Sequence, residues 1–213
     1  MDAWRKSGVV GMIGFNYRFH SLYQEARQLL ASARIGYVVA ARSIFSVSAH
    51  DLPEWKRSRQ SGGGVLLELT THHVDLVRFL FQAEIREVFA SVRSVRSEGD
   101  CAATQLVLEN GAIVQTFCSL SAVEEDRFEI YGDAGKLTID RHRSFQVEVS
   151  GTAQESGFLE RVSGLLRNPH AATKLLHPTA EPSYKAALTH FVAAVKENRQ
   201  TTPISQTAFK ASW

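Results

Sequence analysis

One short segment of the sequence, Gly62–Asp75, holds carboxylate and histidine side chains at helical spacing. On a helix that turns by about 100° per residue, His72 lies about 40° from Glu68, and Asp75 lies about 20° from Glu68 on the other side. The three side chains therefore share one narrow face. Two neighbouring carboxylates are expected to stabilise the imidazolium form of His72 and to hold one tautomer. A histidine in this setting can move a proton on and off a substrate hydroxyl near neutral pH.

The adjacent His73 falls about 140° from Glu68, among the apolar residues of the same helix. We interpret His73 as a core histidine with a hydrogen-bond partner, and we assign the proton chemistry to His72. The spacing leaves an alternative open, in which Glu68 and His72 are a solvated pair one turn apart without a function.

Three glycines, Gly62, Gly63 and Gly64, precede this helix. Glycine is a poor residue to begin a helix unless the backbone must approach something closely. The N-terminus of a helix also offers free N–H groups and a partial positive charge, which favour an anion. The triplet is therefore a candidate for contact with a ligand or cofactor, and a flexible loop end is the alternative.

The elements that must position this segment follow from the hydrophobic pattern. Before it, residues 9–15 predict a buried strand, 20–33 a helix and 37–48 a strand. After it, Asn110-Gly111 predicts a two-residue hairpin with positive φ at both residues. Near the end, 182–198 predict an amphipathic helix with an apolar stripe of Leu188, Phe191, Val192 and Val195. Six further strands are predicted at 87–95, 102–108, 112–120, 127–131, 136–139 and 145–149, and a short helix near 159–166.

Strands that follow one another through tight turns predict an antiparallel meander. Several of them carry one apolar and one mixed face, so one face of the sheet should be covered by helices. The fold class is therefore α+β, with a mainly antiparallel open β-sheet and helices packed on one face.

The composition excludes several classes of protein. With 213 residues, 44% hydrophobic and 22% charged, the chain has enough apolar material for a sizeable core. A net charge of +2 provides no strong field for nucleic acid or a membrane surface. No stretch approaches the roughly 20 apolar residues of a membrane span. We expect a cytoplasmic protein, in which Cys101 and Cys118 are buried thiols rather than a disulfide.

The segment Gly62–Asp75 resembles the sequence signature of a known protein family. Gly62-Gly63-Gly64-x-Leu66-x-Glu68-x-x-x-His72-x-x-Asp75 is similar to the motif of the glucose–fructose oxidoreductase/inositol dehydrogenase/rhizopine catabolism (Gfo/Idh/MocA) family. The likeness covers most of residues 8–200. It extends to a crossover strand at 14–19, to Ile35-Gly36, to Trp55 ahead of the glycines, and to a hairpin at 126–135.

The resemblance implies oxidation of a sugar or cyclitol hydroxyl, or reduction of the ketone, with NAD or NADP. It implies that His72 is the acid/base, acting with a lysine, and that Glu68 is the carboxylate that contacts the substrate. Trp55, Asp75 and Arg18 are further candidates for the substrate site, and Arg18 is also a candidate contact to the cofactor. Family sheets commonly pack face to face, which implies a homo-oligomer through the β-sheet.

Two departures from the family pattern affect these expectations. Glu68 stands where aspartate is usual, so its carboxylate reaches about one methylene further, and Thr70 stands where a small residue is common. The sequence also contains no Gly-x-Gly-x-x-Gly dinucleotide motif and no Glu-Lys-Pro with the family's catalytic lysine. We interpret residues 1–34 as a remnant strand and helix of a dinucleotide-binding domain, and 35–213 as the substrate-binding and oligomerisation domain.

On this interpretation the chain alone binds neither NAD nor NADP tightly and is inactive, and a separate dinucleotide-binding chain is a possible partner. Two alternatives stay open. Glu68, His72 and Asp75, with His142 or His170, could hold a divalent ion in a metal-dependent sugar-processing enzyme. Alternatively, the sheet could serve as a non-catalytic interaction module.

Overall fold

The computed structural model describes residues 6–48, 53–151 and 181–201. The described residues form two compact units, one within residues 21–180 and the other from residues up to 20 together with those from 181 onward. Each unit is considered by itself below. The predicted helix near 159–166 and His170 lie outside the described residues.

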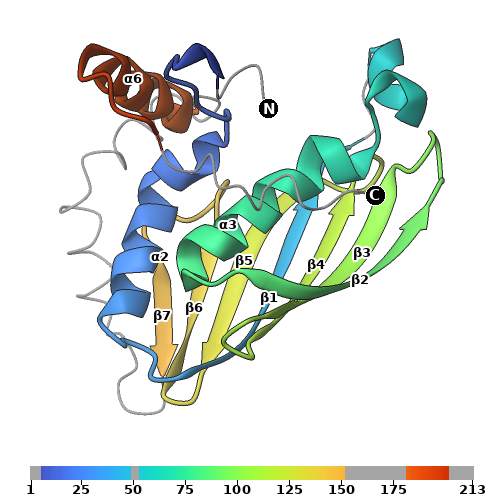
Figure 1. Cartoon of the computed structure of the whole chain (residues 1–213). Coiled ribbons are helices and arrows are strands. Elements are labelled where there is room, and N and C mark those ends of the chain that lie inside the picture. The colour runs from blue at the N-terminus through green and yellow to red at the C-terminus, as the bar shows by residue number, and fades with distance from the viewer. Residues whose placement is uncertain (1–5, 49–52, 152–180, 202–213) are drawn as a thin grey trace. The chain divides into compact units, whose positions relative to one another are not determined.

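The larger unit is built on a seven-stranded sheet with the order β2-β3-β4-β1-β5-β6-β7 (Figure 1). Every neighbouring pair is antiparallel except β1 and β4, which run parallel. The mainly antiparallel open sheet is therefore confirmed. The strands are β1 (Val38–Ser46), β2 (Ile85–Arg93), β3 (Cys101–Leu108), β4 (Ile113–Ser119), β5 (Glu125–Gly132), β6 (Gly135–Asp140) and β7 (Glu148–Gly151).

The prediction of a simple meander is wrong at one place. β1 lies between β4 and β5, which are consecutive in the sequence, and pairs with both. Ser43 of β1, for example, is opposite Thr116 on one side and Phe128 on the other. The strand that precedes the helix segment in sequence therefore joins two antiparallel halves of the sheet.

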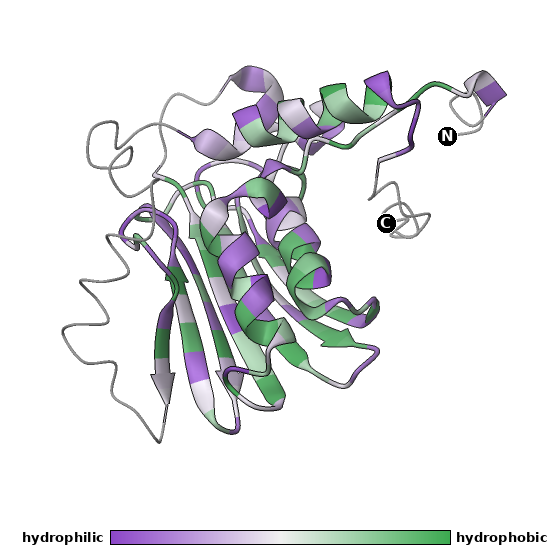
Figure 2. Cartoon of the chain, turned by 90° about the vertical axis from the view of Figure 1, so that its left-hand side faces the viewer, coloured by the Kyte–Doolittle hydropathy of each residue, from purple (hydrophilic) through white to green (hydrophobic). Residues whose placement is uncertain are grey.

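Helices α2 (Ser21–Ala31) and α3 (Thr71–Phe81) cover one face of the sheet (Figure 1). This inner face receives alternate strand residues, and the hydrophobic residues of strands and facing helices form a common core (Figure 2). Burying one such side chain stabilises the fold by about 1.5–3 kcal/mol. The fully buried core side chains include Leu22, Tyr23, Leu76, Leu106, Phe128, Ile130, Leu137 and Ile139.

The outer face of the sheet carries a buried carboxylate among exposed side chains. Only 3% of the Glu129 side chain is exposed, because hydrogen bonds from Arg42, Arg127, Lys136 and Tyr131 surround it. Burial raises the pKa of Glu129, but the hydrogen bonds from Arg42 and Lys136 outweigh burial and lower that pKa to about 2.

Replacing Glu129 by glutamine should make the stability of the fold less sensitive to acid. The folded-state pKa of about 2 lies below the ordinary value of 4.5, so the native state binds this proton less readily than the unfolded state does. The carboxylate therefore stabilises the fold fully above about pH 4.5 and loses that effect as the pH falls towards 2. Urea unfolding at a series of pH values should give a flatter stability curve for E129Q.

Glu109, which is exposed in the β3–β4 turn, provides a matched control for this measurement. The E109Q variant should keep the acid dependence of the parent chain. A curve for E129Q that is as steep as that of E109Q would contradict the assignment.

The turn at Asn110-Gly111 joins β3 and β4 as predicted, but its conformation differs from the prediction. Gly111 has φ of +86°, whereas Asn110 is not among the described residues with positive φ. The Asn110 side chain instead accepts a hydrogen bond from the Ala112 backbone, and Leu108 N–H donates to the Ala112 carbonyl. The connection is therefore a longer loop closed by an asparagine side chain, rather than a two-residue turn.

The smaller unit consists of η1 (Asn16–Phe19) and α6 (Pro182–Lys196) with the segment that precedes η1. The strand predicted at 9–15 is wrong: this segment has no regular secondary structure, and Thr201 donates a hydrogen bond to the Gly11 carbonyl. The helix predicted at 182–198 is confirmed. Its buried positions are Ser183, Ala187 and Ala194, however, while Leu188, Val192 and Val195 of the predicted stripe are exposed.

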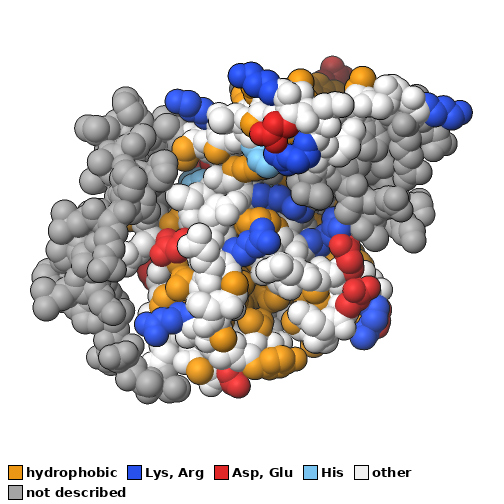
Figure 3. Space-filling view, turned by 60° about the vertical axis from the view of Figure 1, so that its left-hand side comes forward, with side chains coloured by type: hydrophobic (Ala, Val, Ile, Leu, Met, Phe, Trp, Pro, Cys, Tyr) orange, Lys and Arg blue, Asp and Glu red, His pale blue; other side chains and the backbone are white. Residues whose placement is uncertain are grey.

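Both cysteines are free thiols, as predicted, but Cys101 is only half-buried where a buried thiol was expected. Cys118 is buried on β4, and burial raises the pKa of its thiol to about 12, which leaves it unreactive at neutral pH. None of the helices in the described ranges is long and apolar enough to cross a membrane. The face shown in Figure 3 carries charges of both signs, without a large patch of one sign.

Candidate functional site

The helix predicted from the glycine triplet to Phe81 is confirmed, but its first turns are not regular. Leu66–Thr70 form a π-helical stretch, η4, which continues directly into α3. The Thr70 and Thr71 hydroxyls donate to the Val65 and Leu67 carbonyls, so threonine side chains compete for backbone acceptors here. A π-turn holds more residues than an α-turn, so the angles predicted for a uniform helix do not apply between Glu68 and His72.

Glu68 lies in the π-helical stretch and is not a free carboxylate. Its side chain, 17% exposed, accepts a hydrogen bond from the Lys56 ammonium group. That ammonium group also lies 5.1 Å from the centre of the Trp55 ring, within the range of a cation–π contact. The indole of Trp55 is half exposed, at 50%. The structure therefore brings Trp55, Lys56 and Glu68 together in one polar and aromatic group.

The glycine triplet makes the close approach that its sequence predicts, but the partner is the chain's own backbone. A Cβ atom on Gly63 would lie 2.3 Å from the carbonyl oxygen of Lys56. Gly62 and Gly64 have φ of +88° and +94°, which glycine adopts at low cost. The triplet thus brings the backbone of the Lys56 loop onto the start of the helix.

The N–H groups of the glycine triplet already donate hydrogen bonds within the chain. Those of Gly62, Gly63 and Gly64 donate to carbonyl oxygens of the preceding loop, at 2.9 to 3.2 Å. The next N–H group, of Val65, donates to the Gly99 carbonyl in the β2–β3 loop at 2.9 Å. These four donors do not fit a phosphate cradle, which needs N–H groups directed at the anion. The proposed contact of the triplet with a cofactor therefore finds no support in this geometry.

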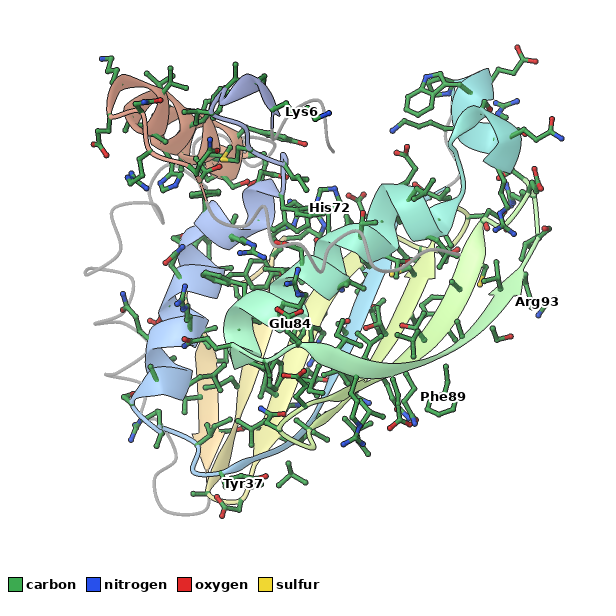
Figure 4. All side chains as sticks on the ribbon, in the orientation of Figure 1. Lys6, Tyr37, His72, Glu84, Phe89 and Arg93 are labelled. Atoms are coloured by element: carbon green, nitrogen blue, oxygen red, sulfur yellow. The ribbon has the colours of Figure 1, made fainter. Side chains whose placement is uncertain are left out.

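His72 lies near the amino-terminal end of α3 (Figure 4). Its ring meets the Phe45 ring edge-on, with the centres 6.4 Å apart. Burial lowers the pKa of His72, and the positive charges of His73 and Arg141 lower it further, against a smaller opposite effect of Asp126 and Glu68. The prediction that neighbouring carboxylates stabilise imidazolium is therefore wrong, because burial dominates and because Glu68 is neutralised by Lys56.

His73 is a core histidine, as predicted, but neither of its ring nitrogens makes the predicted hydrogen bond within the described residues. It is fully buried, and its Nε2 lies 3.5 Å from the Oδ1 of Asp126 on β5. Burial raises the pKa of Asp126, but the adjacent His73 imidazole and the charge and hydrogen bond of Arg141 outweigh burial and hold that pKa well below its usual range. An ionised carboxylate therefore lies beneath the helix that carries His72.

Asp75 and Arg18 are two further residues that the sequence predicts for the site. Asp75 was expected on the polar face with His72, but it is only 3% exposed, because that face of α3 turns partly towards the core. Arg18 belongs to η1 of the smaller unit, whereas the site residues belong to the larger unit. The roles of both in substrate binding remain predictions. Among the described residues, no three His, Cys, Asp or Glu side chains are grouped to hold a metal ion, and His142 lies instead 3.8 Å from Glu124.

Lys56 is the functional candidate that the sequence reasoning missed. It lies twelve residues before Glu68, in a loop that predicts no element, so helical spacing could not relate the two. A sequence feature that could have identified Lys56 is its position beside Trp55 and ahead of three glycines. In chemical terms, the site offers a neutral imidazole that can accept a proton, and beside it an ammonium–carboxylate pair that can bind hydroxyl groups.

A family model described as the GFO/IDH/MocA C-terminal domain matches residues 23–138. The chain is 29% identical over 205 residues to 1,5-anhydro-D-fructose reductase of Ensifer adhaerens, covering 93% of this chain and 57% of the relative. It is 25% identical over 177 residues to myo-inositol 2-dehydrogenase of Thermotoga maritima, covering 76% and 52%.

Among solved structures, levoglucosan dehydrogenase in its apo form has the same fold, with a TM-score of 0.77 at 20% identity. The similarity covers 95% of this chain and 61% of that one. The chain spans about half the length of the curated relatives that it matches.

Proposed function

The chain belongs to the Gfo/Idh/MocA family and contains its C-terminal domain, and from this premise we propose that it is the substrate-binding and catalytic part of an NAD(P)-dependent sugar or cyclitol oxidoreductase. The observation that carries the proposal is the group formed by His72 and the Lys56–Glu68 pair at the start of the α3 helix. The names of the relatives, an anhydrofructose reductase and an inositol dehydrogenase, support a cyclic polyol or its ketone as the substrate.

In this proposal His72 is the acid/base. Oxidation of a secondary alcohol releases a proton and a hydride, and a neutral, partly buried imidazole is suited to accept the proton. Glu68 and Lys56 bind neighbouring hydroxyl groups of the substrate, as acceptor and donor. The exposed indole of Trp55 covers an apolar face of the ring, because sugar and drug-sized sites combine aromatic surface with a few polar groups.

The hydride acceptor, NAD or NADP, is assigned to a separate dinucleotide-binding segment. The glycine triplet does not form a phosphate cradle, because its N–H groups donate within the chain. We therefore assign no residue of this chain to the cofactor phosphates. A separate dinucleotide-binding chain or domain is the partner that the proposal requires.

Calorimetric titration of this chain with NAD⁺ and with NADP⁺ should show no tight binding of either. The reason is that the N–H groups of the glycine triplet already donate to carbonyl oxygens of the chain and are not directed at a pyrophosphate group. Myo-inositol 2-dehydrogenase of Thermotoga maritima, titrated in parallel, serves as the positive control. A low-micromolar dissociation constant for the present chain would overturn the assignment of the cofactor to another segment.

The activity itself is tested with a chimera, in which the dinucleotide-binding segment of that dehydrogenase precedes this chain. The chimera should reduce NAD⁺ with at least one substrate from a panel of cyclitols, aldoses and anhydro sugars. The absorbance of the reduced nicotinamide measures the reaction. If the chimera binds NAD⁺ but oxidises no polyol and reduces no corresponding ketone, the proposed function is wrong.

A second proposal concerns the outer face of the sheet, which we assign to contact between copies of this chain. Phe89 and Phe117 are exposed there, and Phe89 extends from β2 on the side away from the helices (Figure 4). Together with Arg42, Gln105 and Gln115 they line an open hollow of about 640 Å³. In sedimentation experiments F117E should shift a homo-oligomer towards the monomer, and a strictly monomeric parent chain would exclude the contact.

We also propose a cytoplasmic location. Its support is that Cys101 and Cys118 are unpaired thiols, which are typical of proteins in a reducing compartment.

A further inference from the structure

A buried ion pair lies beneath the proposed acid/base and has no role in the proposed function so far. Asp126, at 0% exposure, accepts a hydrogen bond at Oδ2 from the Nε of Arg141, at 2.6 Å. Its other oxygen accepts one from the Tyr23 hydroxyl at 3.2 Å. The Arg141 backbone N–H also donates to the Asp126 carbonyl at 2.9 Å, so both backbone and side chain hold the pair in place.

A fully buried carboxylate is costly for a fold unless it is paired and hydrogen-bonded. Hydrophobic residues of similar size would often stabilise the core as well or better. The Arg141 side chain is also 14% exposed, so part of this side chain contacts water while its guanidinium group pairs with the buried Asp126. The ion pair therefore calls for an explanation other than stability.

One aromatic ring connects the pair to His72. Phe45 stacks on His73, with the ring centres 5.0 Å apart and the planes at 19°. The edge of the His72 ring meets the same Phe45 ring, and the Arg141 guanidinium carbon lies 6.0 Å from its centre. Movement of His73 or of Arg141 therefore displaces the ring against which His72 is held.

Charge connects the pair to His72 as well. The charged and titratable groups that act on the His72 imidazole are Glu68 of η4, His73 of α3, Asp126 of β5 and Arg141 after β6. The negative Asp126 raises the pKa of His72, and the positive Arg141 lowers it. Since Glu68 is itself paired with Lys56, Asp126 and Arg141 are, together with His73, the groups whose charges act on His72 from below.

We propose that Asp126 and Arg141 are a positioning pair for His72, which fixes its ring through His73 and Phe45 and cancels the charge beneath it, so that the imidazole stays neutral and oriented to accept a proton. This inference rests on the proposed role of His72 as the acid/base. It adds two residues, which lie beneath the signature helix but come from a strand and a turn distant from it in the sequence, to the machinery of proton transfer.

The test is an NMR titration of the His72 imidazole in this chain, labelled with ¹⁵N-histidine, in D126N, R141M and the double variant. With D126N the positive Arg141 is left uncompensated, so the pKa of His72 should fall. With R141M the negative Asp126 is left uncompensated, so the pKa should rise. Each shift should be about half a unit or more, and the double variant should return close to the parent value.

The outer face of the sheet offers matched controls. Arg42 and Glu129 form an equivalent ion pair on the opposite face of β1 and β5, so E129Q and R42M should leave the titration of His72 unchanged. Shifts of the same sign in D126N and R141M, or shifts no larger than those of the controls, would overturn the proposal.

If D126N does not fold, the variants of Arg141 alone test the proposal. R141K keeps the charge and should leave the pKa of His72 near the parent value, whereas R141M should raise it. Equal titrations in R141K and R141M would overturn the proposal. The readout needs neither cofactor nor substrate, so loss of the proposed function in the chimera and failure of this inference are separate results.

Discussion

Replacing His72 by asparagine should lower kcat/KM of the chimera by about 10²- to 10⁴-fold, because this is the range that a positioned general acid or base contributes. Asparagine keeps a polar side chain of similar reach but cannot accept the proton of a hydroxyl. The loss should appear in the rate of reduced nicotinamide formation under steady-state conditions. The binding of NAD⁺ by the chimera should be unaffected.

His142 provides the matched control for this substitution. It lies in the exposed turn after β6 and is not part of the proposed site, so H142N should retain the parent activity. In the direction of alcohol oxidation, activity should also fall as the pH drops through the pKa of His72, which lies below the ordinary value of 6.5. An H72N chimera as active as H142N would remove His72 from the mechanism.

Replacing Phe128 by alanine should destabilise the larger unit by about 3–5 kcal/mol, the range for an aromatic side chain removed from a packed core. Phe128 is fully buried on β5, and its ring centre lies 5.8 Å from that of His73. The cavity would therefore open directly beneath the α3 helix. Urea unfolding, followed by far-UV circular dichroism, measures the loss as a shift of the midpoint.

The same substitution on the other face of the sheet should have a much smaller effect. Phe89 is 57% exposed, so F89A should cost less than about 1 kcal/mol when it is measured at low protein concentration. Equal losses in F128A and F89A would mean that the two faces of the sheet are not divided into core and surface as described.

Much of the fold could be predicted from local patterns. Strand β5 alternates polar and apolar residues from Arg127 to Ile130, so both its existence and its inner face follow from the sequence. The position of β1 in the sheet could not be predicted from the sequence, because periodicity identifies a strand but not the strands with which it pairs. The conformation of Asn110 did not follow either, since its side chain bonds to the backbone where a two-residue turn was expected.

The site was predictable to the extent that it lies on one helix. The helix itself and the buried position of His73 on it were predicted, whereas the roles of His72 and Glu68 stay predictions. The π-helical stretch was not predicted, because residue spacing alone does not distinguish a π-turn from an α-turn. Lys56 and Asp126 come from a loop and a distant strand, so only the tertiary structure places them beside the signature helix.

The position of β1 has a consequence for how the chain reaches this fold. Its partners on either side, β4 and β5, begin at Ile113 and Glu125. β1 (Val38–Ser46) therefore cannot pair until strands that lie about 70 or more residues later in the chain have been synthesised. The antiparallel groups β2–β3–β4 and β5–β6–β7 can form early from local contacts. They join into one sheet only when β1 pairs with both β4 and β5. During synthesis on the ribosome, β1 is therefore an unsatisfied strand edge, and its late docking should limit the folding rate of the whole sheet.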